Sequence, residues 1–312
     1  MKCLITGGAG FIGSHLADRL LAEGHQVIAL DNLITGSRSN ISHLISNAQF
    51  RFIQHDCIQG LPPDLETEVI FHFASPASPP KYQQYPVETL LVNTLGTYQL
   101  LEYCKNHGAR MIFASTSEIY GDPLVHPQVE TYWGNVNPNG PRSCYDESKR
   151  AGEAFVAAYI RKFGIDARII RIFNTFGPRM DIHDGRIVTN FIRQILAQQP
   201  LVIYGDGSQT RSLCYVSDLV EGIFQVFMNP AAKGEVFNLG NPMEQTVKEF
   251  ADYITKLFLK PQNYKFLSLP VDDPKRRRPD ITKATQILGW EPKVSLEDGL
   301  KKTITYFKQK PA

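Results

Sequence analysis

Short apolar runs alternate with longer stretches of helical periodicity through the first half of the chain. The apolar runs predict six strands, at Lys2–Thr6, Gln26–Leu30, Phe50–His55, Val69–Ala74, Arg110–Ala114 and Ala167–Ile172. Two long helices are predicted over residues 87–107 and 143–163, which end at Gly108 and Gly164. Strands that alternate with helices favour an α/β fold with a doubly wound, mainly parallel sheet, which binds ligands at the carboxyl ends of its strands.

The pattern changes near residue 174. The loops of residues 174–312 are longer and richer in Gly, Pro and Arg than those before them. Helices are expected at 186–198, 216–228 and 246–258, with short strands at Leu201–Tyr204 and Glu235–Asn238. A chain of 312 residues is also long for one core. We therefore expect a first domain of residues 1–173 and a smaller α/β lobe of residues 174–312 over the ligand edge of the sheet, with segments that can interleave.

The composition narrows the classes of partner. Hydrophobic residues make up 43% of the chain and charged residues 21%, as in ordinary globular proteins, and the net charge of +2 argues against nucleic acid or a membrane as partner. The five cysteines are scattered without metal-ligand spacing, so we expect reduced thiols, no metal site and a cytoplasmic location. The first predicted strand begins at residue 2, which leaves no room for a signal peptide, and no apolar run approaches the ~20 residues that span a bilayer.

A glycine turn, Gly7-Gly8-Ala9-Gly10-Phe11-Ile12-Gly13, lies between the first strand and a helical pattern. Gly7 allows the tight turn, Gly10 lets the backbone approach a pyrophosphate, and Gly13 lets the helix pack closely. The helix N-terminus then offers free N–H groups to the anion. Asp31 ends the second strand, 18 residues after Gly13. Its carboxylate suits ribose hydroxyls and would repel a 2′-phosphate, so a Rossmann-type domain that binds NAD is predicted.

Tyr145 and Lys149 are four residues apart on the second long helix, so both side chains lie on one face. An ammonium beside a phenol favours the phenolate. Lowering the Tyr pKa from ~10 toward ~7 needs about 4 kcal/mol, which Lys149 and a positive nicotinamide ring are expected to supply together. Tyr145 would then act as a general base. Taken alone, the pair could equally be a surface Tyr and Lys on an amphipathic helix.

Polar side chains follow the fifth strand. Thr116, Ser117 and Glu118 come directly after Ala114-Ser115, where hydroxyls and a carboxylate would face the ligand crevice. We expect Thr116 to hydrogen-bond the substrate oxygen that Tyr145 deprotonates, and Ser117 and Glu118 to act on a neighbouring carbon. The alternative is an ordinary Ser/Thr-rich loop that ends in an acid.

Several longer segments resemble a known family. They are His72–Pro80, Ala114–Pro123, Tyr145–Arg150, Arg171–Met180, Asp184–Arg186, Gly207–Arg211, Tyr215–Asp218 and Arg277–Asp280. With them the chain resembles an extended short-chain dehydrogenase/reductase of the nucleotide-sugar epimerase, dehydratase and decarboxylase group. Thr116-Ser117-Glu118 and the loop Ser75-Pro76-Ala77-Ser78-Pro79 are most similar to the decarboxylase branch, whose substrate is UDP-glucuronate.

The resemblance implies a reaction without net redox change. Tyr145 removes the proton of the sugar 4-hydroxyl while C4 gives a hydride to NAD⁺. The 4-keto acid loses CO₂, and Thr116 and Tyr145 hold the developing oxyanion. C5 is then protonated, C4 is reduced again, and UDP-xylose results. Because NAD is regenerated, we expect it to stay bound.

The resemblance also assigns residues to ligands. Positions implied for the cofactor are Gly7, Gly10, Phe11, Ile12, Gly13, Asp31, Asn32, Asp56, Ala74, Ser75, Tyr145 and Lys149. Positions implied for the nucleotide sugar are Asn174, Arg186, Tyr204, Arg211 and Arg277. Guanidinium forks suit phosphate and carboxylate, and Arg277 matches an arginine that lies near the uronate carboxylate as a proton donor in a related decarboxylase. A solvated basic loop remains the alternative for the run Lys275–Arg278.

A homodimer is expected through the helices at 87–107 and 143–163, which pair across a two-fold axis in this group. The alternative is that their apolar residues pack only on the sheet. One departure stands out, because Leu91 and Val92 occupy positions where decarboxylases have a Lys and a hydroxyl residue.

Three other functions are alternatives to decarboxylation. A nucleotide-sugar 4-epimerase usually has a small residue in place of Glu118, and a 4,6-dehydratase has Asp in place of Ser117. A non-catalytic NAD-binding sensor would be expected to lack Tyr145, Lys149 or Thr116, and all three are present.

Overall fold

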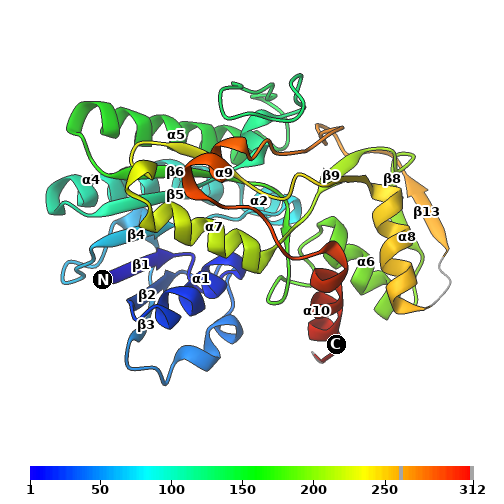
Figure 1. Cartoon of the computed structure of the whole chain (residues 1–312), viewed down its shortest axis with the longest axis horizontal. Helices are drawn as coiled ribbons and strands as arrows, with labels where there is room; N and C mark the ends of the chain where they lie inside the picture. The colour runs from blue at the N-terminus through cyan, green and yellow to red at the C-terminus, as the bar shows by residue number, and fades with distance from the viewer. Residues whose placement is uncertain (260–262, 310–312) are drawn as a thin grey trace.

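A seven-stranded parallel sheet forms the centre of the computed structural model, which describes residues 1–259 and 263–309 (Figure 1). Its order is β11-β6-β5-β4-β1-β2-β3, and every neighbouring pair is parallel. The strands are β1 Lys2–Thr6, β2 Gln26–Asp31, β3 Phe50–Gln54, β4 Val69–His72, β5 Arg110–Thr116, β6 Ala167–Ile172 and β11 Val236–Leu239. The order reverses between β1 and β4, where doubly wound sheets bind their ligands. The predicted fold class is confirmed.

Helices cover both faces of the sheet (Figure 1). Helices α1 (Phe11–Ala22) and α7 (Val216–Met228) pack together on one face, and α4 (Thr97–His107) and α5 (Ser143–Phe163) lie on the other. The alternation of side chains along β1 supports both layers, because Cys3 and Ile5 belong to one buried cluster and Leu4 to the other. A strand buried on both faces explains why the strands read as continuous apolar runs.

The region predicted as one helix over 87–107 consists of three pieces. Helix α3 (Pro86–Leu91) leads through a π-turn at Val92–Gly96 into α4. The wide turn places the amide of Asn93 where its Nδ2 donates to Ser75 Oγ at 3.1 Å and to Ser148 Oγ at 2.9 Å. The helix therefore departs from α geometry where one buried side chain ties it to two neighbouring segments.

A smaller lobe gathers at the carboxyl ends of the strands, on the right in Figure 1. Its helices are α6 Ile187–Leu196, α8 Val247–Phe258 and α10 Leu296–Gln309, and its short strands are β8 Leu201–Tyr204, β9 Thr210–Ser212, β12 Glu244–Thr246 and β13 Tyr264–Leu267. Strand β8 pairs in parallel with β13, and β9 pairs antiparallel with β12. A third small pair joins β7 (Thr175–Phe176) to β10 (Cys214–Tyr215).

The second half of the chain does not stay in this lobe. After β10 it returns to the central sheet, where α7 packs on α1 and β11 pairs with β6 as the edge strand. Two short helices escaped the sequence prediction, α2 (Pro79–Gln84) and α9 (Thr282–Leu288), as did α10. In the part of the chain that the structure describes, no helix combines the length and apolarity needed to cross a bilayer.

Candidate active site

A cavity of about 880 Å³ opens at the carboxyl ends of the strands, with walls from both the sheet and the lobe. Most residues predicted for the site line it: Gly7, Gly10, Phe11, Ile12, Gly13, Ser75, Thr116, Ser117, Glu118, Tyr145, Lys149, Asn174, Arg186, Tyr204 and Arg211. A smaller cavity of about 80 Å³ shares Gly7, Gly10 and Ser75 with it, and is also lined by Asp31, Asn32, Asp56 and Ala74. Apart from Arg277, the residues predicted for the cofactor and for the sugar therefore line two adjoining cavities.

The glycine turn has the shape of a dinucleotide cradle. A Cβ on Gly7, at φ +72°, would come within 2.8 Å of the backbone N of Ala74, and one on Gly13 within 2.2 Å of Gly7 O. Gly10 is the N-cap of α1 and provides no side-chain cap, so the first-turn N–H groups of Phe11 and Ile12, which line the cavity, stay available to an anion. The turn thus fits the pyrophosphate of NAD.

Asp31 is held firmly at the edge of the smaller cavity. It accepts the backbone N–H of Ala9 at 3.0 Å and that of Leu33 at 2.8 Å. Burial raises the pKa of Asp31, and these two hydrogen bonds act against the rise. Each carboxylate oxygen can accept a further bond, as recognition of ribose hydroxyls requires. Nearby, Asn32 Nδ2 donates to Asp56 Oδ2 at 2.9 Å.

Tyr145 and Lys149 lie on one face of α5, as predicted, and both are buried. Lys149 Nζ donates to Ala114 O at 2.7 Å and lies 6.0 Å from the centre of the Tyr145 ring. Burial lowers the pKa of Lys149 to about 7 and raises that of Tyr145 well above its usual value, while a hydrogen bond from Thr116 acts to lower the latter. Burial therefore favours the neutral phenol in the protein without cofactor, and the positive nicotinamide ring on which the prediction also depends is not part of this balance.

Tyr82 of α2 was missed by sequence reasoning. Its ring stacks on that of Tyr145, with centroids 5.1 Å apart and planes 5° from parallel. Tyr82 lines the same cavity, and its buried hydroxyl has no hydrogen-bond partner among the described residues. Tyr82 lies three residues after the Ser-Pro-Ala-Ser-Pro loop, so the similarity of that loop to the decarboxylase branch was the available signal.

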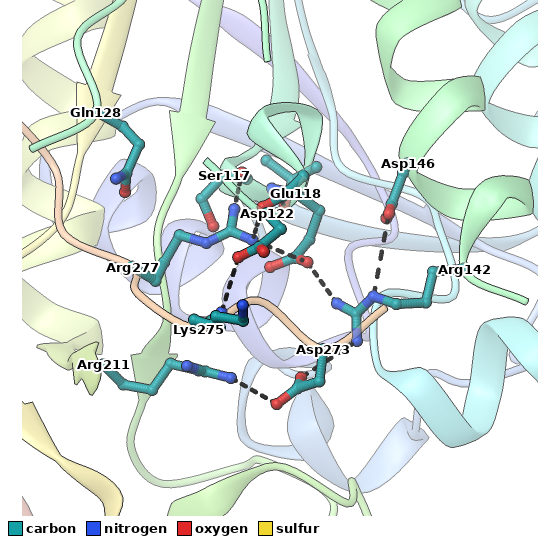
Figure 2. Close-up of polar contacts among 12 residues, drawn as sticks. Ser117, Glu118, Asp122, Gln128, Arg142, Asp146, Arg211, Asp273, Lys275 and Arg277 are labelled. Carbon is teal, nitrogen blue, oxygen red and sulfur yellow. Dashed lines mark hydrogen bonds and ion pairs between the residues drawn. The ribbon is translucent and has the colours of Figure 1, made fainter. Parts of the chain in front are cut away.

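Glu118 lies between two guanidinium groups (Figure 2). Its carboxylate forms a short ion pair with Arg142 Nη2 and lies 3.4 Å from Arg277 Nη2. Burial alone would raise the pKa of Glu118, but Arg277 and Arg142 outweigh it and lower the pKa to about 2. Glu118 is therefore a carboxylate at every physiological pH. Arg142, which lines the cavity, was also missed from the sequence.

Arg277 lies behind this wall of the cavity and is not one of the residues that line it. Only 1% of the residue is exposed, and it donates to the carbonyl oxygens of Ser117 and, at 2.9 Å, of Gly121 (Figure 2). Burial lowers the pKa of its guanidinium. These hydrogen bonds from Arg277 hold in place the loop that contains Ser117 and Glu118.

The other predicted arginines already have carboxylate partners. Arg186 pairs through two nitrogens with Asp184, and Arg211 Nη2 donates to Asp273 Oδ2 at 2.8 Å. Asn174 and Tyr204 also line the cavity, and Tyr204 is 40% exposed. Leu91, singled out above as a departure from the resemblance, is an exposed residue that lines neither cavity.

A family model described as the NAD dependent epimerase/dehydratase family matches residues 3–240. The chain belongs to this family. The matched range contains the glycine turn, Thr116–Glu118 and the Tyr145–Lys149 pair, so the predicted family is confirmed, and with it the NAD dependence that defines the family.

Curated family members are similar over nearly the whole chain. UDP-glucuronic acid decarboxylase 1 of Danio rerio is 53% identical over 306 residues, which are 98% of this chain and 72% of the relative. UDP-glucuronic acid decarboxylase 2 of Arabidopsis thaliana is 51% identical over 313 residues, which are 99% of this chain and 69% of the relative. The predicted resemblance to the decarboxylase branch is confirmed.

Solved family structures share the fold but differ in reaction. A UDP-glucuronic acid 4-epimerase from Bacillus cereus, in complex with UDP-glucuronic acid and NAD, has a TM-score of 0.89 and 31% identity over 99% of both chains. A dTDP-glucose 4,6-dehydratase from Streptomyces venezuelae, solved with NAD, has a TM-score of 0.90 and 29% identity over 99% of this chain and 97% of that one. The fold alone therefore does not choose the reaction.

Proposed function

We propose that this chain is an NAD-dependent decarboxylase that converts UDP-glucuronate to UDP-xylose and CO₂. The observation that supports it most is that Thr116, Glu118 and Tyr145 share one cavity with the glycine turn, in a chain 53% identical to a UDP-glucuronic acid decarboxylase over 98% of its length. Two similar solved structures also contain nucleotide sugars, one UDP-glucose and the other UDP-glucuronic acid. A nucleotide-sugar substrate is therefore in keeping with the structural neighbours.

The cofactor site consists of the glycine turn, the first turn of α1, Asp31, and the residues Asn32, Asp56, Ala74 and Ser75. When bound, NAD⁺ supplies a hydride acceptor and a positive charge, both of which favour loss of the 4-hydroxyl proton. Tyr145 takes that proton, and Thr116, which hydrogen-bonds to the phenol, lies at the same oxygen. Lys149 orients the pair through its bond to Ala114 O.

Loss of CO₂ follows from the ketone at C4. The carboxylate is beta to that ketone, so the electrons of the breaking C–C bond pass into an enolate. The hydroxyls of Thr116 and Tyr145 stabilise the enolate oxygen. Protonation of C5 then gives the 4-keto pentose. C4 would regain the hydride that it gave to the bound cofactor, and Tyr145 would return the proton to the oxygen, so the reaction has no net change in redox state.

Ser117 and Glu118 are the residues of the cavity wall that we assign to the decarboxylation step. Glu118 and Ser117 stand beside the sugar carbon that loses CO₂, and Arg277 acts through them by holding their loop. Asn174, Arg186, Tyr204 and Arg211 bind the nucleotide diphosphate, whose negative charge suits two guanidinium groups.

A product assay tests the function. Purified protein is incubated with UDP-glucuronate labelled with ¹³C at C6, and the products are separated and weighed by mass spectrometry. A UDP-pentose and labelled CO₂ are expected in equal amounts, and Tyr145→Phe should give neither. Recovery of UDP-galacturonate with its label retained would instead identify a 4-epimerase, and a 4-keto-6-deoxy product from a neutral nucleotide sugar a dehydratase.

We propose in addition that the protein is a homodimer. Exposed apolar side chains gather on α3, the π-turn, α4 and α5, namely Val87, Leu90, Leu91, Leu95, Tyr98 and Phe155. Two copies that pair these helices would cover them. Light scattering after size exclusion should give twice the mass of 35.1 kDa.

The five free cysteines, four of them buried, suit the reducing cytoplasm, and cell fractionation would test that location.

A further inference from the structure

One carboxylate of the chain, that of Asp273, lies beside two of the arginines that line the cavity. Asp273 Oδ2 accepts from Arg211 Nη2 at 2.8 Å, and Asp273 Oδ1 lies 3.6 Å from Arg142 Nη1 (Figure 2). All three residues line the large cavity, and they come from three different parts of the chain. Arg211 belongs to β9, Arg142 precedes α5, and Asp273 lies between β13 and α9.

We propose that Asp273 competes with the anionic groups of the nucleotide sugar for Arg211 and Arg142, and so sets the affinity for substrate. The inference rests on the proposed function for the identity of the ligand. In the free protein Asp273 takes the place of the incoming anion, and binding exchanges one negative partner of Arg211 for another.

The surroundings of Arg211 explain why its guanidinium needs an anionic partner when no substrate is bound. Its side chain is 13% exposed, and Asp273 is the carboxylate with which it pairs among the described residues. Its remaining hydrogen bond goes to the carbonyl oxygen of Thr210 at 2.8 Å. A largely buried guanidinium without an anion is costly, so the free protein is more stable with Asp273 in place. Arg142 differs, because it keeps Glu118 as a partner whether or not Asp273 is present.

The segment that holds Asp273 lies outside the helices and strands of the fold. Residues 268–274 form no helix or strand, and Leu269 and Val271 are 49% and 68% exposed. Asp272 has φ +60°, which a non-glycine residue adopts at a cost of about 1 kcal/mol. Buried Arg277 fixes the far end of the segment. Asp184, the partner of Arg186, differs, because it is buried and only two residues away from its arginine.

The test compares two neighbouring carboxylates. Asp273→Asn removes the competing charge, and Asp272→Asn removes the same charge one residue away. Asp272 accepts from Asn137 Nδ2 at 3.1 Å and forms no ion pair with an arginine among the described contacts. Calorimetric titration with UDP-glucuronate, done on each NAD-loaded protein in a Tyr145→Phe background so that the ligand is not turned over, gives the dissociation constants. We expect a Kd roughly three- to tenfold lower for Asp273→Asn, and within twofold of the parent for Asp272→Asn.

Other results overturn the proposal. An unchanged or higher Kd for Asp273→Asn would mean that Asp273 orders the arginines for substrate rather than competing with it. An equal gain in both variants would indicate a general effect of net charge. Titration with UDP separates this question from the proposed function, because UDP brings the diphosphate without the uronate. If the parent enzyme binds UDP but not UDP-glucuronate, the proposed substrate is wrong, and the UDP constants of the two variants still decide the role of Asp273.

Discussion

Replacement of Lys149 by Met should change how the stability of the protein responds to pH. Lys149 is 2% exposed, and burial lowers its pKa to about 7, whereas an unfolded chain holds a lysine pKa near ~10.4. Between these values the unfolded chain binds the proton and the folded one does not, so raising the pH favours the folded state. Below about pH 7 both forms are protonated, and the buried charge destabilises the fold by a constant amount.

The magnitude follows from the width of this window. Each pH unit between about 7 and 10 adds up to about 1.4 kcal/mol to the unfolding free energy of the parent, but adds nothing through this site in Lys149→Met. Over the whole window, the unfolding free energy of the parent should rise by about 4 kcal/mol relative to that of Lys149→Met. The lost hydrogen bond to Ala114 O lowers the stability of the variant at all pH values by about 1–3 kcal/mol, which leaves the slope unaffected.

Urea unfolding of the NAD-free proteins at pH 6, 7.5 and 9 measures the effect. With a slope of about 3 kcal/mol per molar urea, the difference in midpoints should move by roughly 0.4–0.5 M per pH unit above 7, and not below it. Lys162→Met, at an exposed lysine near the end of the same helix, is the matched control and should run parallel to the parent. Parallel curves for Lys149→Met as well would refute the argument, because they would mean that Lys149 keeps an ordinary pKa in the fold.

Three further substitutions test other parts of the site. Glu118→Gln leaves Arg142 and Arg277 without their shared anion and should slow turnover at least roughly tenfold while NAD binding is kept, as steady-state rates and cofactor fluorescence would show; an unchanged rate would contradict a role for this carboxylate. Gly13→Ala places a Cβ 2.2 Å from Gly7 O and should weaken NAD binding more than tenfold in titrations, whereas Glu23→Ala at the end of the same helix should not. Leu91→Lys restores the residue found in decarboxylases at an exposed position outside both cavities, so the KM for UDP-glucuronate should stay within twofold, and a larger drop would show that this helix face reaches the substrate.

The parts of the site that could be predicted are those whose geometry is local. The strand, glycine turn and helix around Gly7–Gly13 are contiguous, and the four-residue spacing of Tyr145 and Lys149 fixes their common face. Arg142 and Asp273 escaped prediction because their contacts join distant segments, as in the pair Arg211–Asp273, which is 62 residues apart in sequence. No local pattern reports such a contact.

Burial is an effect on Tyr145 that the sequence does not report. The sequence shows that a lysine lies near a tyrosine, and that proximity predicts a lower phenol pKa. It does not show that both groups are enclosed, and the enclosure of Tyr145 reverses the direction of its shift. Helix α10 was missed for a different reason, since the apolar spacing of Leu296, Leu300, Ile304 and Phe307 was present in the sequence and was not used.

The return of residues 216–239 to the central sheet has a consequence for synthesis on the ribosome. When residues 1–173 have emerged, six of the seven strands of the central sheet are available, and only β11 is missing. Helix α1 still lacks its partner α7, and β6 still has an unpaired edge of backbone N–H and C=O groups. Both are covered only after about seventy further residues have been translated. The nascent chain therefore passes through a stage in which an apolar helix face and an open strand are exposed together, which is the condition under which chaperones bind and chains aggregate.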